Sequence, residues 1–82
     1  MTTDHLLLAN LSKLHTTELG LVRIKKNLSL DTDQVVDWCK TKICSPHAAI
    51  SQKGKNWYVE ADGCILTINA HSYTIITAHK KN

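Results

Sequence analysis

The chain has 82 residues, 43% of them hydrophobic, and ten Lys and Arg against seven Asp and Glu give a net charge of +3. This length predicts a single domain, residues 1–82, with a thin core, so we expect a homo-oligomer. The apolar fraction excludes a disordered chain, and the modest positive charge favours anionic partners. No stretch approaches the ~20 apolar residues of a membrane span, and the amino terminus lacks a signal-peptide pattern. We therefore expect a cytoplasmic protein with no membrane partner.

The chain contains three cysteines, Cys39, Cys44 and Cys64. An odd number argues against a disulfide framework. Cys39 and Cys44, with His47 close behind, have a spacing that is unusual for a zinc site, and no second ligand pair follows. We therefore expect buried free thiols, no metal and no cofactor.

The periodicity of the chain changes near Pro46, from helical before it to strand-like after it. In the first part, Leu7, Leu11 and Leu14 repeat at positions i, i+4 and i+7. This spacing predicts a first helix over residues 4–14.

A second helix is predicted to start with Thr16 or Thr17 as its cap and to continue to about Leu28. Gly20 lies in its first turns, where glycine costs ~1 kcal/mol relative to alanine. Such a glycine indicates the close approach of another backbone or of a ligand.

A third helix is predicted from the sequence DTDQVVDWCKTKI. Asp31 would cap it and Gln34 would complete a capping box. The helix would end near Ile43, and Pro46 prevents its continuation.

The second part of the chain begins with a predicted β-hairpin. Its strands, NWYVEA and CILTIN, flank Asp62-Gly63, a strong signal for a two-residue turn. This turn pairs Val59 with Leu66 and places the apolar residues of both strands on one face. A short edge strand is expected over residues 48–51.

A third strand is predicted after a three-residue loop at 70–72, because this register pairs Leu66 with Ile76 and keeps one face apolar. The other face would then carry a mixed, largely polar set: Tyr58, Glu60, Ile65, Thr67, Asn69, Tyr73, Ile75, Thr77 and His79.

These patterns together predict an α+β domain. Two or three N-terminal helices would pack on one face of a three- to four-stranded antiparallel β meander. The helical half would cover about residues 4–44 and the β-meander half about residues 48–80.

Polar and basic side chains gather in three segments: the second helix, the Lys53-Gly54-Lys55 turn and the last two strands. A helix amino terminus and a lysine-bearing turn both favour anions. The predicted ligand-binding residues are His15, Thr16, Thr17, Arg23, Lys26, Asn27, Lys55, Asn69, Thr77, His79 and Lys80. The alternative without a ligand is that this sheet face is simply solvated, or that it forms a protein interface that includes Tyr58 and Tyr73.

No P-loop, Rossmann fingerprint, HExxH or GxSxG motif occurs in the sequence. Metal-independent RNA cleavage would still be possible with a histidine as acid or base and a cation on phosphate. The candidates for that chemistry are His15, His79 and Arg23. Whether the protein is an enzyme stays open at this point.

Three stretches, LHTTELGLVRIKKNL, GKNWYV and LTINAHSYTIITAHK, resemble a small bacterial and phage family of unknown function. The resemblance covers nearly the whole chain and implies no activity. It implies that the polar residues of these stretches belong to the family pattern, Ser72 and Thr74 among them. A fainter likeness, in the order of elements, is to the barnase, EndoU, colicin D and RelE-like nuclease superfamily.

We therefore expect the protein to bind a phosphate-bearing ligand, either a small nucleotide or RNA. A phage protein that sequesters a host nucleotide signal would fit this description. The alternatives are a metal-independent ribonuclease of toxin type and a protein-interaction module or inhibitor.

Overall fold

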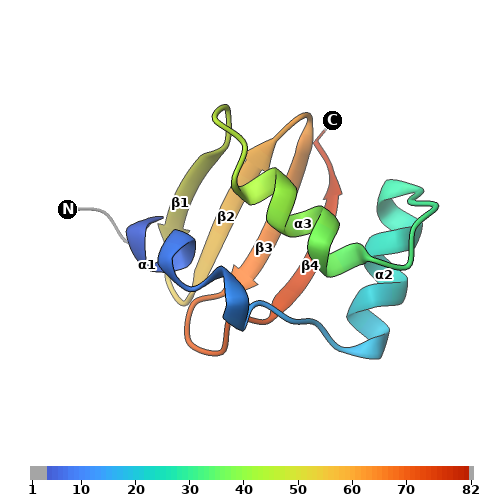
Figure 1. The fold of residues 1–82 in the computed structure, drawn as a ribbon, viewed down its shortest axis with the longest axis horizontal. Coiled ribbons are helices and arrows are strands. Elements are labelled where there is room, and N and C mark those ends of the chain that lie inside the picture. The colour runs from blue at the N-terminus through green and yellow to red at the C-terminus, as the bar shows by residue number, and fades with distance from the viewer. Residues whose placement is uncertain (1–3, 82) are drawn as a thin grey trace.

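A four-stranded antiparallel sheet follows three helices in the computed structural model, which describes residues 4–81 (Figure 1). The elements in chain order are α1 (Asp4–Ala9), the 3-10 helix η1 (Leu11–Lys13), α2 (Glu18–Leu28), α3 (Val35–Ile43), β1 (Ala49–Lys53), β2 (Asn56–Ala61), β3 (Cys64–Asn69) and β4 (Ile75–Lys80). In Figure 1, α1 and α3 cross one face of the sheet, whereas α2 lies beside β4. The predicted α+β class and the meander are confirmed.

The sheet has the strand order β1-β2-β3-β4, and two tight turns set its first registers. Asp62 and Gly63 both have positive φ, 50° and 76°, which is the type I′ turn that Asp-Gly favours. Val59 pairs with Leu66, as predicted, and β1 forms the predicted edge strand. The β1–β2 turn has Gly54 at φ 62° in its first central position.

The predicted register of the last strand is wrong. Leu66 pairs with Ala78 rather than with Ile76, because the β3–β4 loop is longer than three residues and a bulge leaves Ile76 without a partner. The bulge also reverses the predicted faces of two residues. Ile75 is fully buried, whereas Ile76, which was predicted on the apolar face, is 41% exposed. Ile75 therefore belongs to the core and not to the polar face.

Two helix boundaries also differ from the prediction. The first helix ends at Ala9 rather than at residue 14, since the Asn10 side chain donates to the carbonyl of Leu6 and a 3-10 turn follows. The third helix begins at Val35, and Gln34 gives no side-chain cap. The backbone N–H of Gln34 donates to the Thr32 hydroxyl instead of to Asp31, so the predicted capping box does not form.

The core lies between the helices and the sheet. Its fully buried large side chains are Leu7, Ile24, Val35, Cys39 and Ile43 from the helices and Trp57, Val59, Leu66, Ile68 and Ile75 from the sheet. The ring of Tyr73 lies 5.3 Å from that of Trp57, centre to centre, and packs against this core. Tyr73 is therefore a core neighbour and not a side chain of the polar face.

Helix α2 covers the outer edge of β4 through hydrogen bonds. The Thr16 hydroxyl donates to the carbonyl of Ile75 at 2.8 Å, and the Asn27 amide donates to that of Ala78 at 3.2 Å. Before the helix, the backbone of His15 accepts from the N–H of Ile75 at 2.8 Å. The outward backbone groups of Ile75 and the outward carbonyl of Ala78 thus have partners from the helical half of the chain.

Candidate functional site

One hollow of about 700 Å³ lies between the β1–β2 turn and the β3–β4 loop. We call it the loop pocket; it is lined by Gln52, Gly54, Lys55, Asn69, Ala70, His71 and Ser72. The backbone N–H of Ala70 donates to the carbonyl of Lys55 at 2.7 Å and fixes the two loops against each other. Two of the predicted ligand-binding residues, Lys55 and Asn69, therefore meet in one place.

Asn69 organises the loop that forms one wall of this pocket. Its side-chain oxygen accepts from the backbone N–H groups of His71 and Ser72, both at 2.9 Å, and from the Ser72 hydroxyl at 3.2 Å. Because this oxygen is engaged, Asn69 has only its amide nitrogen to offer a ligand. The neutral hydrogen bond predicted between Asn69 and a ligand could therefore come only from this nitrogen.

A chain of polar contacts leads from this wall to His15. The Ser72 and Thr74 hydroxyls are 2.7 Å apart, and Thr74 Oγ1 lies 3.0 Å from His15 Nε2. On its other side, His15 Nδ1 lies 2.9 Å from the carbonyl oxygen of Lys13, so Nδ1 must carry a hydrogen. The chain of contacts thus ties the β3–β4 loop to the segment before α2.

The loop pocket is positively biased. Lys55 and His71 line it, and no carboxylate within residues 4–81 does. Among residues 4–81, no acidic side chain forms an ion pair with Lys55, whereas three other lysines are paired. An anion is therefore the charged group that this pocket accommodates best.

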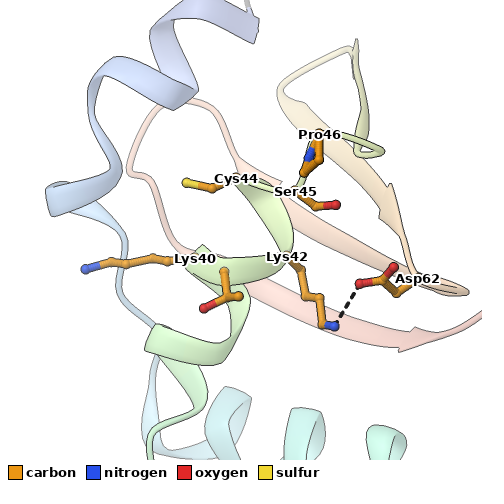
Figure 2. A pocket seen from close by; sticks show the side chains of 7 residues that line it. Lys40, Lys42, Cys44, Ser45, Pro46 and Asp62 are labelled. Carbon is orange, nitrogen blue, oxygen red and sulfur yellow. Dashed lines mark hydrogen bonds and ion pairs between the residues drawn. The ribbon is translucent and has the colours of Figure 1, made fainter.

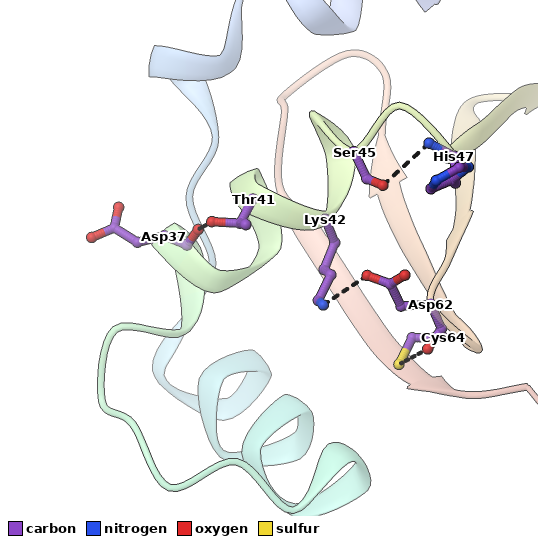
Figure 3. A network of polar contacts seen from close by, with 7 residues as sticks. All are labelled: Asp37, Thr41, Lys42, Ser45, His47, Asp62 and Cys64. Carbon is purple, nitrogen blue, oxygen red and sulfur yellow. Dashed lines mark hydrogen bonds and ion pairs between the residues drawn. The ribbon is translucent and has the colours of Figure 1, made fainter.

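A second hollow, of about 650 Å³, lies at the end of α3 and is lined by Lys40, Thr41, Lys42, Cys44, Ser45, Pro46 and Asp62 (Figure 2). Lys42 Nζ is 2.8 Å from a carboxylate oxygen of Asp62, and this hydrogen bond and charge lower the pKa of Asp62. Figure 3 shows that this pair joins α3 to the β2–β3 turn, next to a contact between the Cys64 thiol and the carbonyl of Asp62. Within residues 4–81, Lys40 remains as an unpaired charge in this lining, but the Asp62 carboxylate makes the hollow less suited to an anion than the loop pocket.

The cysteines are only partly as predicted. Cys39 is buried, but Cys44 is exposed and Cys64 is half-buried, and all three are free. Burial, with a smaller effect of the nearby Cys64, raises the pKa of Cys39 to about 12. No set of three His, Cys, Asp or Glu side chains within residues 4–81 is arranged to hold a metal ion.

Three predicted residues near the start of α2 and in it have structural contacts. Thr16 and Asn27 bond to β4, and the Thr17 hydroxyl caps α2 by accepting from the N–H of Gly20 at 3.0 Å. Arg23 and Lys26 are exposed on the same helix, away from the loop pocket. These side chains do not join Lys55 and Asn69 in one site.

The predicted residues of β4 lie on two faces. Thr77 and His79 pair with Thr67 and Ile65 on the face away from the helices, whereas Lys80 pairs with Cys64 on the helix side. His79 is five residues beyond Thr74, which places it roughly 16 Å along the strand from His15. His15 and His79 are therefore too far apart to serve one phosphate together.

Sequence reasoning missed His71, Ser72 and Gln52 as residues of the pocket. His71 reads as a solvated loop residue, and Gln52 as an ordinary residue of an edge strand. Ser72 was noted only as part of a resemblance. Their common position at one end of the sheet follows from the strand order, which brings the β1–β2 turn beside the β3–β4 loop.

No helix within the described part of the chain has the length and apolar character needed to cross a membrane. A family model described as "Protein of unknown function (DUF3781)" matches residues 8–79, from the end of α1 to the end of β4. No curated protein and no solved structure matches the chain, so the likeness to the nuclease superfamily stays a prediction. The predicted resemblance to an uncharacterised family is confirmed.

Proposed function

This chain belongs to the DUF3781 family, whose description assigns no activity, and we propose from its geometry that it binds a phosphate-bearing ligand in the loop pocket. The ligand would be a small nucleotide or RNA. The observation that carries the proposal is a pocket that presents Lys55 and His71 and no carboxylate. Its volume of about 700 Å³ falls in the range typical of small-molecule sites.

The chemistry of the lining suits a phosphate group. The ammonium group of Lys55 supplies a point charge with three donors, and the Gln52 amide supplies neutral donors. The clamp between Ala70 and Lys55 holds the two loops in place before a ligand arrives, which lowers the ordering cost of binding.

Binding is better supported than cleavage. A general acid and a general base must both reach the reacting atoms, and His15 and His79 lie roughly 16 Å apart along the strand. Both ring nitrogens of His15 also have partners within the protein. The ribonuclease alternative would therefore need a different pair of groups.

The test is a titration of labelled nucleotides and a short RNA, read by fluorescence anisotropy. Lys55→Ala should weaken binding by about tenfold or more, because a hydrogen bond to a charged group contributes about 1.5–3 kcal/mol. Lys26→Ala is the matched control: it removes the same charge from α2 and should change affinity by less than about twofold.

Each alternative predicts a different result. If Lys26→Ala weakens binding as much as Lys55→Ala does, the ligand does not occupy the loop pocket. If the RNA becomes shorter during the titration, the protein is a nuclease. If no nucleotide or RNA binds, the proposal fails and the interaction module remains. A steep loss of affinity with salt would favour RNA over a small nucleotide.

A further inference from the structure

The two edge strands of the sheet, β1 and β4, differ in whether their outward backbone groups have hydrogen-bond partners. At the β4 edge, Thr16, Asn27 and the backbone of His15 provide hydrogen-bond partners. At the β1 edge, no backbone hydrogen bond within residues 4–81 engages the outward side of the strand. Proteins usually protect such an edge, because its unpaired groups are a template for another strand.

The register of β1 shows which groups point outward. The two-residue turn makes Lys53 and Asn56 a hydrogen-bonded pair, so Ser51 with Tyr58 is the next such pair along the ladder. Ile50 and Gln52 lie between these pairs. Their N–H and C=O groups therefore point away from β2.

Strand β1 lacks most of the devices that usually protect an edge strand. It contains no proline, its pairing with β2 shows no bulge, and its one charged residue, Lys53, is at its end. These are the devices that keep edge strands from pairing with other chains. The β1 edge is thus available for pairing as it stands.

We propose that β1 pairs antiparallel with β1 of a second copy, which joins the two sheets into one continuous sheet. With a two-fold axis at Ser51, Ile50 of each copy faces Gln52 of the other. Each such pair then exchanges both of its backbone hydrogen bonds. Lys53 faces Ala49 of the other copy, so no like charges stand opposite each other. In this register the segment can pair with itself without opposing like charges.

Helix α1 adds an apolar contribution at the same side of the molecule. It packs next to β1, and its Leu6 and Leu8 are 50% and 45% exposed while Leu7 between them is buried (Figure 1). A second copy docked on β1 brings its own α1 to the same junction. The pairing of two copies then covers leucine surface that a single thin domain leaves in water.

The proposal is tested by the mass of the protein in solution, measured by light scattering after size exclusion. The wild type should be a dimer that dissociates on dilution. Gln52→Pro removes one outward N–H and leaves the β1–β2 hydrogen bonds intact, so it should give a folded monomer by circular dichroism. Gln52→Thr keeps the N–H and should remain a dimer.

Amide hydrogen exchange gives a readout at the residues themselves. The N–H groups of Ile50 and Gln52 should exchange slowly in the dimer and rapidly after dilution. The N–H of Ser51, bonded to Tyr58 in either state, is the internal control and should change little. A wild type that is monomeric at all concentrations, or a folded Gln52→Pro dimer, would overturn the proposal. Pairing of the β1 edge with a peptide of another protein, without self-association, would also overturn the proposal.

Discussion

The substitution Gly20→Ala tests how closely α2 packs against β4. A methyl group at this position would overlap the Thr16 hydroxyl, and would lie 3.2 Å from the Thr17 hydroxyl and 3.6 Å from the carbonyl oxygen of Ile75. The Thr16 hydroxyl is the group that donates to that carbonyl. The added methyl therefore acts on the contact that covers the β4 edge.

The magnitude follows from opposing effects. Alanine in place of a helical glycine stabilises by about 1 kcal/mol. Displacing Thr16 loses a hydrogen bond of about 1 kcal/mol, and the overlap and the unpaired carbonyl add roughly 1–3 kcal/mol. The net destabilisation should be about 1–3 kcal/mol, which lowers the midpoint of thermal unfolding by roughly 4–24 °C in a domain of this size.

The assay is thermal unfolding followed by circular dichroism at one fixed protein concentration, so that association does not change the midpoint. In the Thr16→Ala background the overlapping atom is absent, and Gly20→Ala should there raise the midpoint, although the Thr17 hydroxyl limits the gain. The two substitutions should couple by about 2–4 kcal/mol. If Gly20→Ala stabilises the protein that retains Thr16, helix propensity outweighs the packing and the reasoning is refuted.

Three other predictions use single substitutions or labelling. In urea denaturation, Ile75→Ala should lower the free energy of unfolding by about 2–5 kcal/mol, because Ile75 is fully buried. Ile76→Ala should lower it by less than about 1 kcal/mol. Equal losses would contradict the bulge. Lys42 lowers the pKa of Asp62, so the wild type should lose stability relative to Asp62→Asn as the pH falls through that pKa. A pH-independent difference in urea midpoints would exclude this linkage. Cys39, with its pKa raised to about 12, should resist iodoacetamide at neutral pH until urea unfolds the protein, whereas the exposed Cys44 is accessible. Labelling of Cys39 itself in the native protein, located by mass spectrometry of peptides, would argue against its burial.

Features set by neighbouring residues were predictable. The Asp62-Gly63 turn, a threonine cap on α2 and the alternation along β2 and β3 each depend on a few adjacent positions, and all three are present. Of the two expected cap residues, Thr16 and Thr17, it is Thr17 that caps the helix. The capping box predicted for α3 also depended on adjacent residues, but it does not form. There, the Thr32 hydroxyl competes successfully for the N–H of Gln34.

The candidate site was only partly predictable. Lys55 and Asn69 were identified by residue type, but the sequence could not show that His71 joins them or that Thr16 is engaged with β4. A polar side chain looks the same in the sequence whether it binds a ligand or a carbonyl group 59 residues away. The role of each depends on which segments the fold brings together.

The sequence by itself determined the order of elements, the strand pairing across Asp62-Gly63 and the family pattern. Only the tertiary structure decided the bulge at Ile76, the position of α2 along the β4 edge and the assembly of the loop pocket. Alternation defines the two faces within one strand, but the loop and the packing choose its register against the next. The outward carbonyl groups of Ile75 and Ala78 need partners, and Thr16 and Asn27, distant in sequence, supply them.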